Sequence, residues 1–397
     1  MNWADIRTSV EHDPGITYLN TGTSGLIPKA IHQATLRLRE KLHHNPTDYV
    51  WRSMADELWK SRARLATHLE TNPERLVFFS NISQAINTFC LSVDLPQGSD
   101  ILLSDHEYGA MRWAWERAAK IRGWNIVPFT LPVETEYSQE IVAAVERSIT
   151  GNTKLLFLSH ILYSTGLVLP IQEICARARS RHIVTFIDGA HAPGMLPLDL
   201  STMDADFYAA NLHKWFLTPV GAAFLYCDPR SRHHLRPWQV SWGFSEGELS
   251  ATERNEFGST PWIRQFEMEG TRDLTSWFVV SQSCDFIESL GYSAIRARHF
   301  ELSSFVREEL SRLGGFQLCT PNHQELRGGL TSFRLSADVD GQKLRNELWN
   351  TYKVEINVID FVGIQYFRVS THAYNTMEEI EKLAKSLRRL LEKGSRA

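Results

Sequence analysis

Short apolar runs alternate with amphipathic helical segments through the first half of the chain, and this alternation limits the folds it can adopt. The runs include RLVFFS, ILLS, WNIVPFTL, KLLFLSH and HIVTFID, and the helical segment PIQEICARARSR separates the last two. Strands alternating with helices build a mainly parallel sheet with helices on both faces. Ligands of such sheets bind at the carboxyl ends of the strands. We therefore expect an α/β fold with a mixed, mainly parallel sheet and a site at that edge.

The stretch from Phe186 to Tyr226 places two charged side chains between two apolar runs. Asp188 ends the run HIVTFID, and Lys214 precedes the run GAAFLY. Taken singly, Asp188 is typical of a helix N-cap and Lys214 of a surface lysine whose stem packs on apolar neighbours. Charged groups beside a buried sheet are unfavourable unless they are paired or used. Together they fit pyridoxal phosphate (PLP), which needs a lysine that forms a Schiff base and an acid at its pyridinium nitrogen.

Four short motifs in this stretch resemble the class V aminotransferase family of fold-type I PLP enzymes. They are D-G-A-H-x-x-G from Asp188, then A-D-F-Y, then N-x-H-K-W, and P-x-G before a strand. The resemblance implies that Lys214 carries the cofactor, that Asp188 pairs with the ring nitrogen and that His191 bonds the phenolic oxygen. It also implies that Asn211 and His213 lie toward the phosphate.

Two other strand ends add candidate cofactor contacts. The segment N-I-S-Q-A resembles the phosphate loop of the family and makes Ile82 and Ser83 candidate phosphate ligands, because amides at a helix N-terminus bind anions. The segment D-H-E-Y stands where the family has an aromatic ring over the cofactor, so His106 is the candidate and Tyr108 the alternative. A serine at a strand-to-helix turn and a polar histidine at a strand end also occur where no ligand binds.

Three segments supply candidate substrate contacts. The segment T-G-T-S-G resembles the entry loop of the family and places Thr23 and Gly25 at the substrate rim; a plain loop before a helix is the alternative. Tyr163 replaces the usual asparagine of a family segment, which leaves open whether it contacts cofactor or substrate. Arg368, in R-V-S-T-H-A-Y-N-T, resembles the arginine that binds the substrate carboxylate through paired hydrogen bonds. Its alternative is a surface arginine at a strand end.

The segment E-G-T-R-D narrows the resemblance to the isopenicillin N epimerase-like branch of the family. In this family the G-T motif reaches the phosphate of the neighbouring subunit. The resemblance therefore implies a homodimer in which Thr271 contributes across the interface. Arg272 is a candidate substrate contact, and its alternative role is an ion pair with Asp273 at a helix N-terminus.

A chain of 397 residues exceeds what one hydrophobic core usually supports, so we expect more than one lobe. The pattern of expected strands and helices changes near residue 290, where shorter strands and helices follow a long helix. We predict an N-terminal arm over residues 1–20, a large PLP-binding domain over 21–275, a connecting helix over 276–291 and a small C-terminal α/β domain over 292–397.

The composition indicates a small-molecule partner. The chain is 43% hydrophobic and 22% charged with a net charge of −4, which gives no reason to expect nucleic acid binding. The first residues lack the apolar core of a signal peptide, and no apolar run is long enough to span a membrane, so we expect a cytoplasmic protein. The 5 cysteines lack C-x-x-C spacing, and neither a disulfide framework nor a metal site is expected.

The resemblance leaves several reactions open, all of which begin with loss of the α-proton of an amino acid. We expect a carbon-sulfur lyase acting by β-elimination or an epimerase, and elimination ranks first because it requires only one base. A class V aminotransferase is the alternative, and a catalytically silent binding protein is a second one. Cysteine desulfuration is disfavoured, because that branch needs a cysteine shortly before the carboxylate-binding arginine, and TYKVEINVIDFVGIQYFR contains none.

Overall fold

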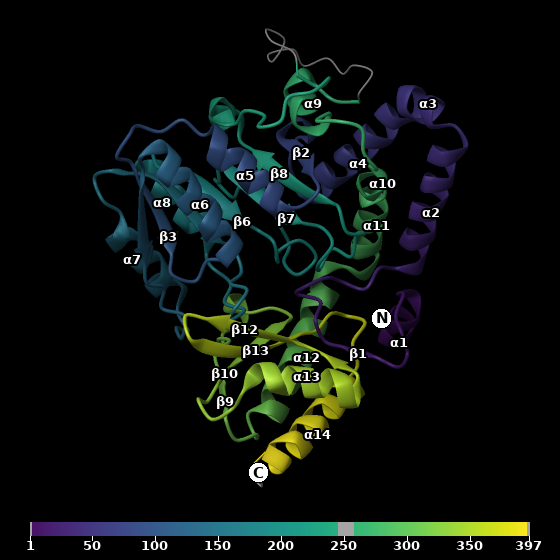
Figure 1. The fold of residues 1–397 in the computed structure, drawn as a ribbon, viewed down its shortest axis with the longest axis vertical. Coiled ribbons are helices and arrows are strands. Elements are labelled where there is room, and N and C mark those ends of the chain that lie inside the picture. The colour runs from purple at the N-terminus through teal and green to yellow at the C-terminus, as the bar shows by residue number, and fades with distance from the viewer. Residues whose placement is uncertain (1, 245–257, 395–397) are drawn as a thin grey trace.

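The computed structural model describes residues 2–244 and 258–394. At its centre lies a seven-stranded sheet in the order β2-β8-β7-β6-β5-β3-β4 (Figure 1). Strand β8 runs antiparallel to both neighbours, and the other pairs are parallel, which confirms the mixed, mainly parallel sheet. The strands are β2 Leu76–Phe79, β3 Asp100–Ser104, β4 Asn125–Phe129, β5 Thr153–Ser159, β6 Val184–Asp188, β7 Phe207–Asn211 and β8 Ala223–Cys227.

Helices cover both faces of this sheet because successive side chains of a strand point to opposite faces. In β2, Leu76 and Phe78 join the core formed with α4, α7, α8 and α11, whereas Val77 and Phe79 join the core formed with α5, α6 and α9. These helices are α4 Met54–His68, α5 Ile82–Ser92, α6 Gly109–Arg122, α7 Ser138–Ser148, α8 Ile171–Ser180, α9 Pro261–Glu267 and α11 Val280–Leu290.

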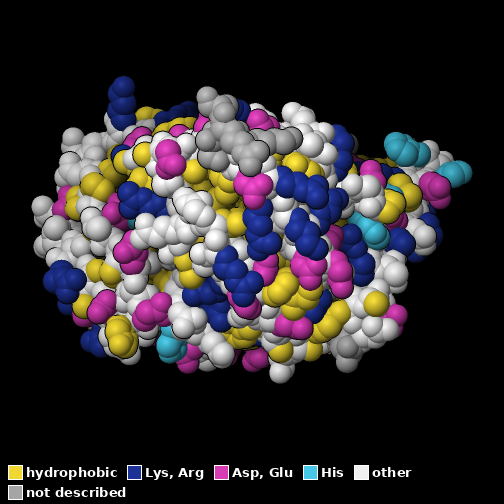
Figure 2. Space-filling model, turned by 90° about the horizontal axis from the view of Figure 1, so that it is seen from below, with side chains coloured by type: hydrophobic (Ala, Val, Ile, Leu, Met, Phe, Trp, Pro, Cys, Tyr) yellow, Lys and Arg dark blue, Asp and Glu magenta, His cyan; other side chains and the backbone are white. Residues whose placement is uncertain are grey.

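A second sheet forms below the first in Figure 1, with its own hydrophobic core. Its strands are antiparallel in the order β12-β13-β10-β9. Seen from below, side chains of both charges intermingle over this lobe, as expected of a solvated face (Figure 2). Its elements are α12 Tyr292–Leu310, β9 Phe316–Leu318, β10 Leu330–Leu335, α13 Gly341–Tyr352, β12 Asn357–Phe361, β13 Ile364–Ser370 and α14 Met377–Gly394.

The first residues pack on this C-terminal lobe. Strand β1 (Thr17–Tyr18) pairs with β11 (Val354–Glu355), and Arg7 of α1 (Trp3–Ser9) forms an ion pair of 2.8 Å with Glu379. The predicted connecting helix coincides with α10 and α11, and α12 begins directly after Gly291. The bounds of the four predicted segments stay a prediction. The remaining elements are α2 Lys29–His44, α3 Pro46–Asp48, α10 Thr275–Phe278, a π-helical turn Tyr49–Ser53, and 3-10 turns Pro73–Arg75, Pro229–His234 and Gln324–Leu326.

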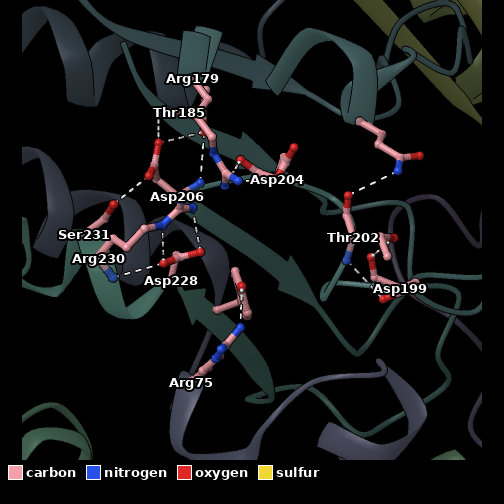
Figure 3. Close-up of polar contacts among 12 residues, drawn as sticks. Arg75, Arg179, Thr185, Asp199, Thr202, Asp204, Asp206, Asp228, Arg230 and Ser231 are labelled. Carbon is pink, nitrogen blue, oxygen red and sulfur yellow. Dashed lines mark hydrogen bonds and ion pairs between the residues drawn. The ribbon is translucent and has the colours of Figure 1, made fainter. Parts of the chain in front are cut away.

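A polar network fixes the edge of the large sheet where β6 and β7 begin (Figure 3). The Asp206 carboxylate accepts hydrogen bonds from the backbone N–H of Thr185 at 2.9 Å and from the hydroxyl of Ser231 at 2.5 Å. Asp228, which follows β8, accepts from Arg230. The polar groups at this edge are hydrogen-bonded to one another, so we assign this edge a structural role. The opposite edge of the sheet is the one available for a ligand.

Candidate active site

The opposite edge of the sheet, together with the C-terminal lobe, encloses a cavity of about 940 Å³. Strands β5, β6 and β7 end at this edge, and the connection between β12 and β13 forms part of the far wall. The lining includes ten of the residues predicted from the sequence: Thr23, Ile82, Ser83, Tyr163, Asp188, His191, Asn211, His213, Lys214 and Arg368.

Lys214 lies in the segment between β7 and β8 and presents its amine to the cavity. Burial lowers the pKa of this amine to about 8, an effect that nearby Asp188 opposes and the charge of Arg368 reinforces. The Lys214 Nζ lies 3.1 Å from His191 Nε2. A lysine whose amine is easily deprotonated is suited to act as a nucleophile and a base.

Asp188 ends β6 and is almost fully buried. Burial raises the pKa of its carboxyl to about 6, although the backbone N–H of Ala190, at 2.9 Å, and the charge of Lys214 both favour the carboxylate. A carboxylate held in this way at the floor of a pocket is an available partner for a cationic ring nitrogen.

The beginning of α5 forms another part of the cavity wall. The Asn211 side chain accepts a hydrogen bond from the backbone N–H of Ile82 at 3.0 Å, which ties this helix N-terminus to the end of β7. Ser83 and His213 line the cavity beside it. The buried Nδ1 of His213 has no hydrogen-bond partner in the described part of the chain, as expected of a group that serves a ligand.

Arg368 of β13 brings a cation from the C-terminal lobe into the cavity, with only 2% of its surface exposed. Its guanidinium donates to the Tyr163 carbonyl at 3.1 Å and to the Asn20 and Thr23 side-chain oxygens, both at 3.4 Å. Its buried Nε finds no acceptor among residues 2–244 and 258–394. Burial lowers the pKa of Arg368 to about 10, so the group stays cationic at neutral pH and retains capacity for an anion.

Gly25 lies behind the lysine rather than on the cavity surface. A Cβ on this residue would stand 2.1 Å from the Lys214 carbonyl oxygen, and the Gly25 N–H donates to the His213 carbonyl at 2.8 Å. The entry loop thus holds the lysine-bearing segment by a close approach that requires glycine.

Three further predicted residues lie outside the cavity lining. The ring of His106 stacks on Phe361 at 5.1 Å, whereas Tyr108, the alternative, lines the cavity. Arg272 forms an ion pair of 2.7 Å with Glu269, and its guanidinium lies over the Trp277 ring. Thr271 is exposed on the outer surface.

Sequence reasoning missed Glu107, a buried acid that also lines the cavity. Its carboxyl accepts from the Ser159 N–H at 3.0 Å and from the hydroxyls of Ser159 and Ser104. Burial raises the pKa of Glu107 to about 7, and the charge of Asp188 contributes to that rise. Its position directly after an apolar strand is the same signal that drew attention to the flanking His106 and Tyr108.

The profile of the family described as Aminotransferase class-V matches residues 16–383. The chain belongs to the class V aminotransferase family. It is 43% identical over 392 residues to an isopenicillin N epimerase of Amycolatopsis lactamdurans, which covers 98% of both chains. It is 40% identical to an isopenicillin N epimerase of Streptomyces clavuligerus, covering 97% of this chain and 98% of that one. Among solved structures, the cystine C-S lyase C-DES has a TM-score of 0.83 at 23% identity and covers 94% of this chain and 97% of its own.

This class V aminotransferase family member is therefore a PLP-dependent enzyme of fold type I. The cavity fits the cofactor. The helix N-terminus beside the unpartnered nitrogen of His213 suits an anion, Asp188 suits a cationic ring nitrogen, and Lys214 supplies the amine. The described residues contain no cluster of three or more candidate metal ligands and no helix long and apolar enough to cross a bilayer.

Proposed function

We propose that this enzyme epimerises the α-carbon of an amino acid whose side chain extends toward the cavity mouth. The observation that carries the proposal is the placement of Lys214 and Arg368 in one cavity with Asp188. Similarity over nearly the full length to two isopenicillin N epimerases favours epimerisation among the reactions open to such a site.

Bound PLP supplies an electron sink that makes the α-proton of an amino acid removable. Arg368 holds the substrate carboxylate by paired, charge-assisted hydrogen bonds. Lys214 takes the α-proton at Nζ, because burial keeps a share of this amine neutral near pH 8. Asp188 stays charged and stabilises a protonated ring nitrogen. These roles, and those of His191, Asn211, His213, Ile82 and Ser83 in holding the cofactor, stay proposals.

Epimerisation also needs a group that returns a proton to the other side of the α-carbon. Tyr163 and Tyr108 line the cavity with their rings 5.1 Å apart, and they come from different segments than Lys214. Burial raises the pKa of Tyr163 to about 12, so its phenol keeps its proton at neutral pH and is able to donate it. We assign this role to the tyrosine pair, and we assign the ring over the cofactor to Tyr108 in preference to His106.

No thiol serves this site. All five cysteines are buried and unpaired, and burial raises the pKa of Cys319 to about 11. This supports a reaction other than desulfuration. Unpaired cysteines also agree with a reducing compartment, and we propose a cytoplasmic location. We further propose a homodimer in which the exposed Thr271 reaches the phosphate of the partner subunit.

The test is a chiral assay of the holoenzyme with single enantiomers of amino acids that bear long side chains. The expected result is that each enantiomer yields the other until both are present, with no loss of total amino acid. Release of pyruvate, ammonia and a thiol from an S-substituted cysteine would assign a lyase, and formation of the keto acid that corresponds to the substrate would assign an aminotransferase. Either outcome would overturn the epimerase proposal.

A further inference from the structure

The Trp215 side chain contacts the His191 ring at Nδ1, and the Nε2 atom of the same ring faces Lys214. The Trp215 indole N–H donates to His191 Nδ1 at 3.2 Å, and His191 Nε2 lies 3.1 Å from Lys214 Nζ. Both Trp215 and His191 are buried. The imidazole is thus held at both nitrogens by the two consecutive residues 214 and 215.

An indole nitrogen has a proton to donate and no lone pair to accept with. In this contact His191 Nδ1 must therefore be the unprotonated acceptor. Burial and the nearby cations Lys214 and Arg368 keep the pKa of His191 well below its usual range, so the ring is neutral. A neutral imidazole whose Nδ1 accepts must carry its proton on Nε2, the nitrogen that faces the lysine.

The Nε2–H group can donate only to a lone pair. A neutral Lys214 amine offers one, whereas an ammonium group offers none. The phenolic oxygen assigned to His191 by family resemblance is likewise an acceptor. We propose that Trp215 is a positioning residue that fixes His191 as the Nε2–H tautomer, so that His191 donates to the lysine nitrogen or to the cofactor oxygen and disfavours the ammonium form of Lys214.

The indole is itself held rigidly by the C-terminal lobe. The Trp215 backbone carbonyl accepts from His372 Nε2 at 3.0 Å, and the His372 Nδ1 accepts from the Ala373 N–H at 2.8 Å. The Trp215 ring packs against His299 with ring centroids 5.5 Å apart. The Trp215 ring packs so closely on the Gly329 backbone that a Cβ on Gly329 would lie 2.7 Å from the ring. The indole therefore has little room to turn. The N–H direction is therefore set by packing and does not depend on His191.

The inference deepens the proposed function, because it concerns the base that removes the α-proton, yet its test does not need turnover. The first measurement is the nitrogen NMR spectrum of the full chain, labelled at histidine with the heavy nitrogen isotope, with and without PLP. The His191 signal is assigned by its loss in His191→Gln. The expected result is a protonated Nε2 and an unprotonated Nδ1 in both states. A protonated Nδ1 in the wild-type chain would overturn the proposal without any tryptophan variant.

The second measurement uses Trp215→Phe, which keeps an aromatic ring and removes the N–H. Trp277→Phe is the matched control, because Trp277 is also buried and donates its indole N–H, to the Gly221 carbonyl at 2.9 Å. The pKa of Lys214 is read in the cofactor-free chain from the pH dependence of its labelling by an amine reagent, followed by peptide mass spectrometry. The other charged or titratable groups that face this amine are Asp188, His191, His213 and Arg368.

In Trp215→Phe, His191 is free to place its proton on Nδ1 and to accept from an ammonium group at Nε2. The pKa of Lys214 should then rise by about one pH unit, a roughly tenfold loss of reactive amine at a given pH below it. Trp277→Phe should leave the pKa unchanged. An equal pKa in Trp215→Phe and the wild-type chain would contradict the proposal. These outcomes are independent of whether the turnover assay reports an epimerase or a lyase.

Discussion

At the scale of single residues, burial shifts the pKa values of the Asp188 carboxyl and the Lys214 amine toward each other. The Asp188 pKa moves up to about 6 and the Lys214 pKa moves down to about 8, so near neutral pH Asp188 is still mostly a carboxylate while a share of Lys214 is the neutral amine. Groups whose pKa values approach the working pH are efficient in proton transfer. The site is therefore suited to removing a weakly acidic proton without extreme conditions.

The lowered lysine pKa predicts the pH dependence of turnover. The neutral amine becomes the main form as pH rises through about 8, so kcat should increase with pH up to that region and then level off. The check is kcat measured at saturating substrate across this range, because kcat reports groups in the substrate complex. A kcat that stays constant through pH 8 would show that another group is the base.

Replacement of Arg368 should weaken substrate binding more than it slows the chemical step. Loss of a buried, charge-assisted carboxylate contact should raise KM roughly tenfold to a hundredfold in Arg368→Ala, with a smaller change in kcat. Arg334→Ala is the control, because Arg334 lies on the adjacent strand β10 with its side chain exposed. Unchanged KM in Arg368→Ala would place the carboxylate contact elsewhere.

At the scale of elements, three separate segments hold the connection between β7 and β8 that bears the lysine. The entry loop donates the Gly25 N–H to the His213 carbonyl, His372 donates to the Trp215 carbonyl, and His191 lies against Lys214. Because these segments are far apart in the sequence, the position of the amine depends on correct packing of both lobes.

A Cβ on Gly25 should displace the lysine-bearing segment. We expect Gly25→Ala to lower the free energy of unfolding by about 1–3 kcal/mol and to weaken PLP binding, because the added carbon overlaps the Lys214 carbonyl. Gly151→Ala is the control, since a Cβ there would meet no atom within 4 Å. Chemical denaturation and PLP titration check both effects. Equal stability of the two variants would contradict the close approach.

Much of this arrangement could be predicted from the sequence, because the candidate catalytic and binding residues lie directly beside apolar runs that are recognisable as strands. The positions of Asp188 after an apolar strand and of Lys214 before another, together with the family motifs around them, led us to expect both residues in one site. The sequence favoured His106 over Tyr108 and missed Glu107, because the turn after β3 decides which side chain faces the cavity. Nor did it predict that Glu269 would pair with Arg272, since this ion pair forms within a long loop without a clear periodic pattern.

At the scale of the whole molecule, the cavity exists only because two lobes meet. The large lobe supplies Asp188 and Lys214, and the antiparallel sheet supplies Arg368 and the connection between β12 and β13. In the proposed mechanism, the substrate carboxylate and the reacting amine are therefore held by different lobes. The predicted domain boundaries describe the same division along the chain and stay predictions.

The proposed dimer predicts that a residue outside the cavity lining of its own subunit affects cofactor affinity. We expect Thr271→Val, which removes a hydroxyl at nearly constant volume, to weaken PLP binding roughly tenfold while sedimentation still reports a dimer. Thr202→Val, at another exposed threonine, is the control. A monomer at all concentrations, or unchanged PLP affinity in Thr271→Val, would contradict a contribution across the interface.

The most direct measurement of the central claim is α-proton exchange in deuterated water, followed by NMR of the amino acid. If Lys214 removes the α-proton, the wild-type holoenzyme should incorporate deuterium at the α-carbon, and Lys214→Ala supplemented with PLP should not. Exchange at the wild-type rate in Lys214→Ala, or no exchange by the wild-type enzyme with any amino acid that it binds, would contradict the account.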